Sequence, residues 1–447
     1  MEQDGVGRGN TMKVFDDEDD CYFPSFYNIY INTSKTLSEM FGSDKEPELF
    51  HEYLHFYQDV STTFGLLNSS HVLNKIKDMY HYVKKIASDR NETIKLPLTG
   101  FDKESTDINL SLFKLYLQYT KTEVISTTEL LELPVKKEEL IKTSDGQEYP
   151  VPVWEITTTD LDKYNFGAHA IMEGICHNLQ KEIYGITEPY IQAPYNLSKM
   201  IWNYMLPDQK NNLKAFIDLS EVSLMHLMSG SVFVETLIKV QNSEIRIDDN
   251  FYQTICALWK TETPKEMDIY QNFDNAYNNL LDDLKGTLTS PLYNWFVQWL
   301  KRELRIGYEL RFSKRPVFSS LLFLKKLSKE ERTKWLSKQF NDNGYPPVRN
   351  SDGHIFCHQK NDILGYLSIL GSIVMSSAYD CLVKQEFEGC TLMENCIAVN
   401  EQSPNIKLPV DDNCTLQPWC KKESKVMCPF AGVWNTWGLT NLNFTRE

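Results

Sequence analysis

The chain has 447 residues, of which 46 are Lys or Arg and 61 are Asp or Glu, so its formal net charge is −15. Hydrophobic residues make up 42% of the chain and aromatic residues 12%, which is too much for an intrinsically disordered protein. So acidic a chain is a poor match for nucleic acid or an anionic membrane as main partner, because both attract basic surfaces. At about 100–200 residues per domain, the length indicates two to four domains.

The N-terminal segment predicts a cytoplasmic protein with a flexible acidic tail at residues 1–20. This segment has no apolar run, and the acidic residues 16–20 stand where a secretory signal would need its apolar core. The longest uncharged stretch, residues 363–379, is shorter than the ~20 residues of a membrane helix, and four serines dilute it. We therefore expect a buried helix there, and neither a membrane nor a nucleic-acid partner.

The first part of the chain alternates strand and helix signals. Residues 22–32 are aromatic and β-branched and predict a strand, and residues 47–67 predict a helix that starts at Pro47. Helical patterns follow at 71–88 and 105–120. Residues 121–160 are mixed, with short extended pieces where prolines interrupt the sequence EYPVPVWEI.

The rest of the chain is predicted to be mainly helical. A helix covers about 165–184, and helical patterns continue to about residue 340. Residues 341–353 are rich in turn formers and predict a linker, after which comes the buried helix at 363–383. Residues 384–447 form a loop-rich segment with many cysteines.

One motif carries chemistry: the HExxH sequence formed by His51, Glu52, Tyr53, Leu54 and His55. Histidines four residues apart lie on one face of a helix, where both imidazoles can bind the same zinc ion. The glutamate between them can take a proton from a water at the metal and pass it to a leaving amine. No Pro or Gly interrupts the surrounding sequence FHEYLHFYQDV, so the motif is expected within a helix.

On this motif the chain resembles the zincin metallopeptidases, whose active-site helix bears HExxH. The resemblance implies that His51 and His55 are zinc ligands and that Glu52 is the general base. It also implies a small sheet ahead of the helix, with an edge strand that pairs with the substrate peptide. Residues 22–32 could supply that strand.

A catalytic zinc needs a third protein ligand as well as an open position. The third histidine that metzincins carry soon after HExxH is absent, so we expect the ligand on another helix, as in the gluzincin branch. Our candidate is Glu173, which shares one helix face with His169 and His177 and lies among apolar residues. A buried carboxylate needs a counter-charge or a metal.

Several alternatives stay open around this site. Glu173 could instead pair with its own two histidines, in which case the third ligand would be His177, His169 or Asp59. We favour Asp59, one turn beyond His55, as an acceptor that orients an imidazole. A donor for the developing oxyanion is also required, and Tyr184, Tyr190 and His226 are candidates. For His226, a position in the core is the simpler interpretation.

Seven of the ten cysteines lie in the last 91 residues. Four of them have the spacing C-x5-C-x17-C-x5-C, from Cys390 to Cys420, which differs from the C-x2-C pairs of zinc ribbons. Free thiols, a structural zinc and disulfides are the three alternatives, and disulfides fit a chain without a secretory signal least. Trp419, Trp434 and Trp437 are expected to pack a small core there.

Together these features predict a mainly helical α+β zinc endopeptidase. Residues 21–340 would form a zincin-like core, with its active-site helix behind a small sheet and a helical insertion at about 68–160. Residues 341–447 would add a helix and the Cys-rich region, with a possible second zinc. The expected partners are a restricted protein or peptide substrate and a regulatory protein. The alternative is a non-catalytic interaction or regulatory protein in which HExxH is coincidental or vestigial.

Overall fold

A computed structural model of the chain shows the arrangement of most of its elements. It describes residues 21–23, 27–90, 93–98, 117–118, 123–125, 130–142, 148–159, 162–186, 191–259, 268–287, 294–313, 315–357, 363–384, 387, 389–402, 407–423 and 428–446. The predicted acidic tail, Tyr190 and most of the helix predicted at 105–120 lie outside these ranges.

The described residues are mainly helical, which confirms the predicted class, a mainly helical α+β protein. The helices up to the middle of the chain are α1 (Leu37–Met40), α2 (Glu46–Ser61), α3 (Thr63–Arg90), α6 (Ala168–Tyr184), α7 (Leu197–Met205), α8 (Leu213–Leu224), α9 (Ser229–Gln241) and α10 (Phe251–Leu258). The later helices are α11 (Ile269–Thr287), α12 (Asn294–Ser313), α13 (Lys329–Asn343), α14 (Ile363–Val383), α15 (Met393–Gln402), α16 (Asn413–Leu416) and α17 (Pro429–Thr436). Short 3-10 helices are η1 (Pro207–Gln209), η3 (Ser319–Lys326) and η4 (Pro418–Glu423).

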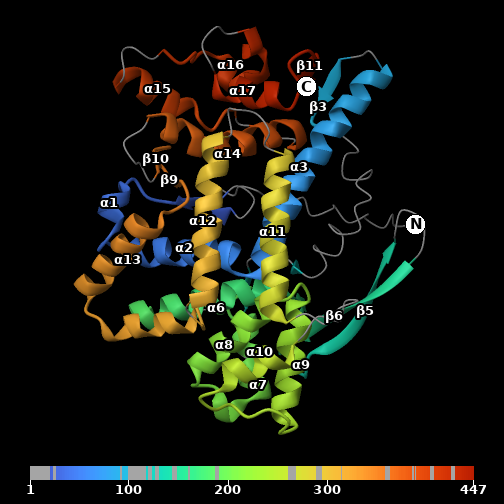
Figure 1. Ribbon diagram of the computed structural model, residues 1–447, viewed down its shortest axis with the longest axis vertical. Helices are drawn as coiled ribbons and strands as arrows, with labels where there is room; N and C mark the ends of the chain where they lie inside the picture. Colours follow the sequence, from blue (N-terminus) through green and yellow to red (C-terminus); the bar gives the residue numbers. More distant parts are fainter. Residues whose placement is uncertain are drawn as a thin grey trace.

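The strands of the described residues form small separate sheets. They are β1 (Cys21–Phe23), β2 (Asn28–Ile31), β3 (Ile94–Leu96), β4 (Glu123–Ile125), β5 (Val135–Lys142), β6 (Glu148–Thr157), β7 (Lys163–Phe166), β8 (Ile191–Ala193), β9 (Val348–Asn350), β10 (Ile355–Phe356) and β11 (Phe444–Arg446). Figure 1 shows α14–α17 at one end of the molecule, α7–α10 at the other, and α2 and α6 between them.

The sheet beside α2 has the order β1-β2-β9-β10. Strands β1 and β2 pair antiparallel, with Cys21 opposite Tyr30, so the single strand predicted at 22–32 is in fact a hairpin. Its reversal includes Tyr27, which has a φ of 49°. Strand β2 lies between β1 and β9, and an interior strand has no free edge for a substrate. Among the described strands, only β1 and β10 are at the edges of this sheet.

The helix predicted at 47–67 is divided at Thr62 into α2 and α3. Thr62 has extended backbone angles, and both its amide and its hydroxyl donate to the carbonyl oxygen of Gln58. These bonds satisfy the carbonyl group that the end of a helix would otherwise leave unpaired. The chain therefore turns at Thr62 and continues as α3 in a new direction.

Among the described residues of the insertion predicted as helical at about 68–160, those of α3 are helical and most of the later ones are extended. After α3, strands β5 and β6 pair as a long antiparallel hairpin, with Val135 opposite Glu155 and Lys142 opposite Glu148. Pro150 and Pro152 lie inside β6, and proline in a helix interior would remove backbone hydrogen bonds. The extended pieces seen in the sequence therefore belong to a sheet.

The C-terminal region is connected to the predicted core through shared sheets. Strand β9 pairs parallel with β2, and β11 pairs parallel with β3, so both residues 348–350 and 444–446 complete sheets begun early in the chain. The region after residue 384 contains more helix than predicted, in α15, α16 and α17. Its tryptophans are buried as expected, and the rings of Trp419 and Trp434 stack 6.4 Å apart.

A buried ion pair holds the end of α2 in place. Arg311 of α12 and Glu221 of α8 are both completely buried and form a salt bridge. The guanidinium also donates to the carbonyl oxygen of Ser61, the last residue of α2. Helices α8 and α12 thereby hold the C-terminal end of α2 in place.

None of the helices in the described part of the chain is both long enough and apolar enough to cross a membrane. The stretch at 363–379 belongs to α14, and the described residues of that helix from Ile373 to Leu382 are buried.

Candidate metal centre

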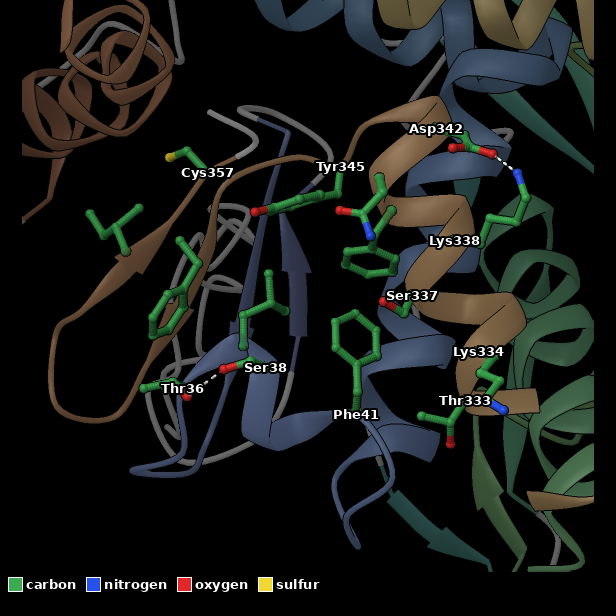
Figure 2. A pocket seen from close by; sticks show the side chains of 15 residues that line it. Thr36, Ser38, Phe41, Thr333, Lys334, Ser337, Lys338, Asp342, Tyr345 and Cys357 are labelled. Atoms are coloured by element: carbon green, nitrogen blue, oxygen red, sulfur yellow. Dashed lines mark hydrogen bonds and ion pairs between the residues drawn. The ribbon is translucent and has the colours of Figure 1, made fainter. Parts of the chain in front are cut away.

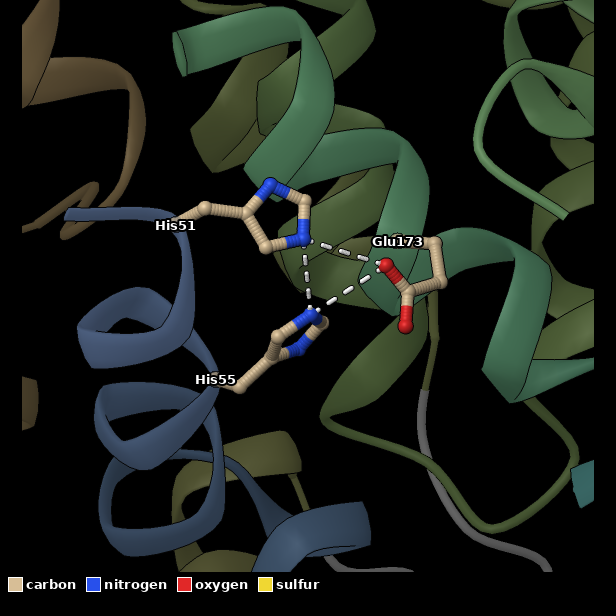
Figure 3. Close-up of side chains that lie close together, drawn as sticks. All are labelled: His51, His55 and Glu173. Carbon is tan, nitrogen blue, oxygen red and sulfur yellow. Dashed lines mark hydrogen bonds and ion pairs between the residues drawn. The ribbon is translucent and has the colours of Figure 1, made fainter. Parts of the chain in front are cut away.

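Helix α2 presents both histidines of the HExxH motif to the neighbouring helix α6. Almost every residue from Leu49 to Ser61 is buried, so α2 is an interior helix with protein on all its sides. His51 and His55 lie one turn apart on the face toward α6, and Glu173 points at them from α6 (Figure 3). Of the described residues, only these three bring three His, Cys, Asp or Glu ligand atoms within 4.8 Å of one another, the spacing at which they could hold a metal ion as they stand.

The three side chains bring their ligand atoms to one point. Oε2 of Glu173 lies 3.3 Å from Nε2 of His51 and 3.2 Å from Nε2 of His55. The two imidazole nitrogens are themselves 3.2 Å apart. The structure therefore brings together the three residues that were predicted as metal ligands, although Glu173 lies 118 positions after His55 in the sequence.

Two glutamines, the buried Gln58 and the half-buried Gln180, set the tautomers of the imidazoles. The side-chain nitrogen of Gln58 donates to the carbonyl oxygen of Met172 at 3.0 Å, which turns its Oε1 toward Nδ1 of His55 at 2.9 Å. An amide oxygen only accepts, so Nδ1 of His55 carries the hydrogen. Oε1 of Gln180 lies 3.1 Å from Nδ1 of His51 in the same way. In the neutral rings, both Nε2 atoms are then acceptors.

Three acceptors at this distance repel one another unless a positive charge lies between them. Burial alone would raise the pKa of Glu173, but His55 and His51 hold that pKa well below its usual range, so the carboxylate is ionised. Burial opposes the charging of His55, yet Cys176 and Glu173 raise its pKa well above the ordinary value. The site therefore favours a cation, which is a proton on His55 or a metal ion in its place.

The two histidines that flank Glu173 on α6 have different positions. Nε2 of His169 lies 3.6 Å from Oε1 of Glu173, the oxygen that does not face the other two ligands. Burial lowers the pKa of His169, so it lies beside the carboxylate as a neutral group. His177 lies farther along, with its Nε2 3.4 Å from the amide nitrogen of Asn196, and burial lowers its pKa to about 4.

The structure also shows where the predicted general base Glu52 and the predicted imidazole acceptor Asp59 lie. Glu52 is buried on α2, and its carboxylate interacts with the thiol of Cys176 on α6. Asp59 is completely buried and contributes to the raised pKa of Tyr27, while the Nδ1 atoms of the two ligand imidazoles face glutamines. The position predicted for Asp59 beside an imidazole is thus held by Gln58.

Neither described candidate for the oxyanion donor faces the metal group. The hydroxyl of Tyr184 donates to Glu46 at the start of α2. His226 is buried against the ring of Trp259, 6.2 Å away, in keeping with a core histidine. Instead, the ring of Tyr195 lies 5.9 Å from the ring of His51 and 5.8 Å from that of His177. No local pattern in the sequence singles out Tyr195.

A large groove of about 1000 Å³ lies on the opposite side of α2 from the metal group. It runs between α1, α13 and β10, with Phe41, Phe340 and Tyr345 on its walls (Figure 2). Phe340 packs on Tyr53, which points away from His51 and His55 on the same helix. This groove is therefore separate from the metal centre.

Comparison with known proteins identifies no relative: no family model, curated protein or solved structure matches the chain. The function has to be inferred from the site itself.

Proposed function

We propose that this chain is a zinc-dependent endopeptidase with a zincin-like site in which His51, His55 and Glu173 hold the metal. One observation supports this proposal above all others. Ligands ~2.0–2.1 Å from a tetrahedral zinc are about 3.3–3.4 Å apart. The three ligand atoms here are separated by 3.2, 3.2 and 3.3 Å. Two imidazoles and one carboxylate also leave the fourth position to water or substrate, as in catalytic zinc sites.

When bound, zinc would polarise the scissile carbonyl and lower the pKa of a water toward ~7. The chain itself supplies the base. Glu52 follows His51 directly on α2 and is buried. Its carboxylate takes the proton of the attacking water and delivers it to the nitrogen of the leaving amine.

Tyr195 is the residue best placed to donate a hydrogen bond to the developing oxyanion. Its ring contacts His51 on the side of α6 that carries His177. A phenol beside a metal ligand can direct its O–H at a carbonyl oxygen that approaches the same metal.

The enclosure of the site supports a restricted substrate. The side chains of His51 and His55 are 8% and 7% exposed, and that of Glu173 is 15% exposed. A polypeptide can reach such a site only as an extended strand or after the surrounding segments move. We therefore expect few cleavage sites per substrate, and rapid, unselective digestion of unfolded casein would contradict this expectation.

The function is tested on the full chain with zinc bound. Cleavage of a denatured protein mixture is followed by mass spectrometry of the new termini, with zinc content measured on the same samples. We expect Glu52→Gln to lower the rate at least ~100-fold, the usual contribution of a general base, while zinc stays bound. Glu48→Gln, one turn earlier on α2, is the matched control and should cleave normally. Wild-type rates in Glu52→Gln would refute the mechanism.

A further inference from the structure

A second group of metal-ligand side chains lies in the C-terminal region, far along the chain from the metal centre. It consists of four cysteines, called the thiol cluster here: Cys390, Cys396, Cys414 and Cys428. All four are free thiols, and Cys414 and Cys428 are buried. The spacing in the sequence had indicated Cys420 as the fourth member, but Cys420 is exposed and its thiol donates to Gln417.

Backbone contacts bring the segments of the cluster together. The amide of Cys390 donates to the carbonyl oxygen of Cys414 at 2.7 Å. Gly389 has a φ of +107° and lies so close to Thr415 that a Cβ there would be 2.8 Å from the Thr415 Cα. This close approach needs a glycine, because no other residue fits that backbone conformation and that space.

The four thiols are close enough to interact electrostatically in every pair. The thiol of Cys390 interacts with those of the other three members, and that of Cys396 with those of Cys414 and Cys428. The remaining pair, Cys428 and Cys414, interacts as well. Three segments of the chain, 389–402, 407–423 and 428–446, therefore bring the four sulfurs into one neighbourhood.

Backbone N–H groups donate hydrogen bonds to two of the four sulfurs. Backbone N–H groups of Phe430 and Ala431, at the start of α17, donate to the sulfur of Cys428. The N–H of Leu392 donates to the sulfur of Cys390. Burial raises the pKa of Cys390 and Cys396 to about 12 and also raises that of Cys428, so these thiols are neutral until a metal binds. Hydrogen bonds to a charged acceptor are stronger than those to a neutral one, so the donors favour the thiolate that a metal would bind.

Lys421 supplies the positive charge that such a cluster needs. Only 6% of it is exposed, and its Nζ lies 2.7 Å from Sγ of Cys414 and 3.1 Å from a carboxylate oxygen of Asp411. It also interacts with Cys396 and Cys428. A buried ammonium group beside a sulfur is stable only if negative charge is close to it.

We infer that Cys390, Cys396, Cys414 and Cys428 form a structural site for a soft divalent cation such as zinc. Four thiolates close a tetrahedral site, and short helices joined by loops gain folding stability from such a metal. Sulfurs ~2.3 Å from zinc are about 3.8 Å apart. Because no three of these sulfurs lie within 4.8 Å of one another, binding would draw the three segments closer together. This inference is independent of the proposed peptidase function.

The first test is the zinc content of the full chain, purified under reducing conditions. We expect two equivalents in the wild type and one in the double variant His51→Ala/Glu173→Gln, which removes the other centre. In that background, Cys414→Ser or Cys428→Ser should lower the content to zero, whereas Cys420→Ser should leave one equivalent. Zinc retained in both Cys414→Ser and Cys428→Ser would overturn the inference.

A second measurement uses the unaltered cysteines, in case these variants do not fold. In the double variant, added Co²⁺ should produce an intense thiolate-to-metal charge-transfer absorption. Alkylation before and after chelation, read by mass spectrometry, should show these four cysteines labelled only after the metal is removed. No charge-transfer band, equal labelling with and without chelator, or a disulfide among the four in the reduced chain would each refute the site.

Discussion

Gln58 allows the clearest test of how the metal centre is constructed. It is completely buried and makes two hydrogen bonds, from its amide nitrogen to Met172 and from Nδ1 of His55 to its Oε1. Gln58→Leu keeps the side chain about the same size and removes both bonds. The carbonyl oxygen of Met172 and the Nδ1–H of His55 would then be buried without these partners.

The magnitude follows from these two losses. A buried polar group that loses its partner costs about 1–3 kcal/mol. The loss at Met172 lowers the stability of the chain with or without metal, because that bond does not involve a ligand. The loss at His55 frees the ring to rotate or to change tautomer, and losing such a supporting contact weakens metal binding about 10–100-fold. We expect both effects in Gln58→Leu.

The assay measures the two effects separately. Zinc affinity is measured by competition with a chromophoric chelator, and stability by chemical denaturation of the metal-free chain. Gln58→Glu should bind zinc more tightly than Gln58→Leu, because a carboxylate still accepts from His55. Gln241→Leu removes a comparable bond to the carbonyl of Met205 and should leave zinc affinity unchanged. Zinc affinity within twofold of wild type in Gln58→Leu would refute the tautomer argument.

Three further outcomes are expected. Gly174→Ala should destabilise the chain by about 1–3 kcal/mol in chemical denaturation, because a Cβ on Gly174 of α6 would be 2.0 Å from the hydroxyl of Ser198 on α7. Unchanged stability would mean that α6 and α7 separate easily. Tyr195→Phe should lower kcat about 100–1000-fold with zinc content unchanged, and full activity would remove Tyr195 from the mechanism. Burial lowers the pKa of His226 from its ordinary 6.5 to about 4, so the unfolded chain takes up that proton first as the pH falls. Neutral His226 therefore stabilises the folded chain above pH 6.5, and this stabilisation, at most about 3 kcal/mol, is lost as the pH falls to 4. His226→Gln should flatten the pH dependence of the free energy of unfolding in that range.

Local sequence was sufficient for features that depend on the helical repeat. Four-residue spacing puts His51 and His55 on one face wherever a helix forms, and no Pro or Gly interrupts the residues around them. Glu173 could be proposed in the same way, since an acidic residue in an otherwise apolar helix needs a positive partner. Both inferences use only residues within a few turns of each other.

The tertiary structure alone decided which residues support these ligands and where the chain pairs with itself. Gln180 of α6 and Tyr195, which precedes α7, reach His51 only through tertiary packing, and nothing in their own neighbourhoods marks them. Gln58 lies three residues after His55 on α2, but its amide is oriented by the carbonyl oxygen of Met172 on α6. Strand β2 likewise pairs with β9, more than 300 residues later, so its interior position in the sheet was hidden from local patterns. Helix formation depends on neighbours in sequence, whereas these contacts depend on which distant surfaces bury one another.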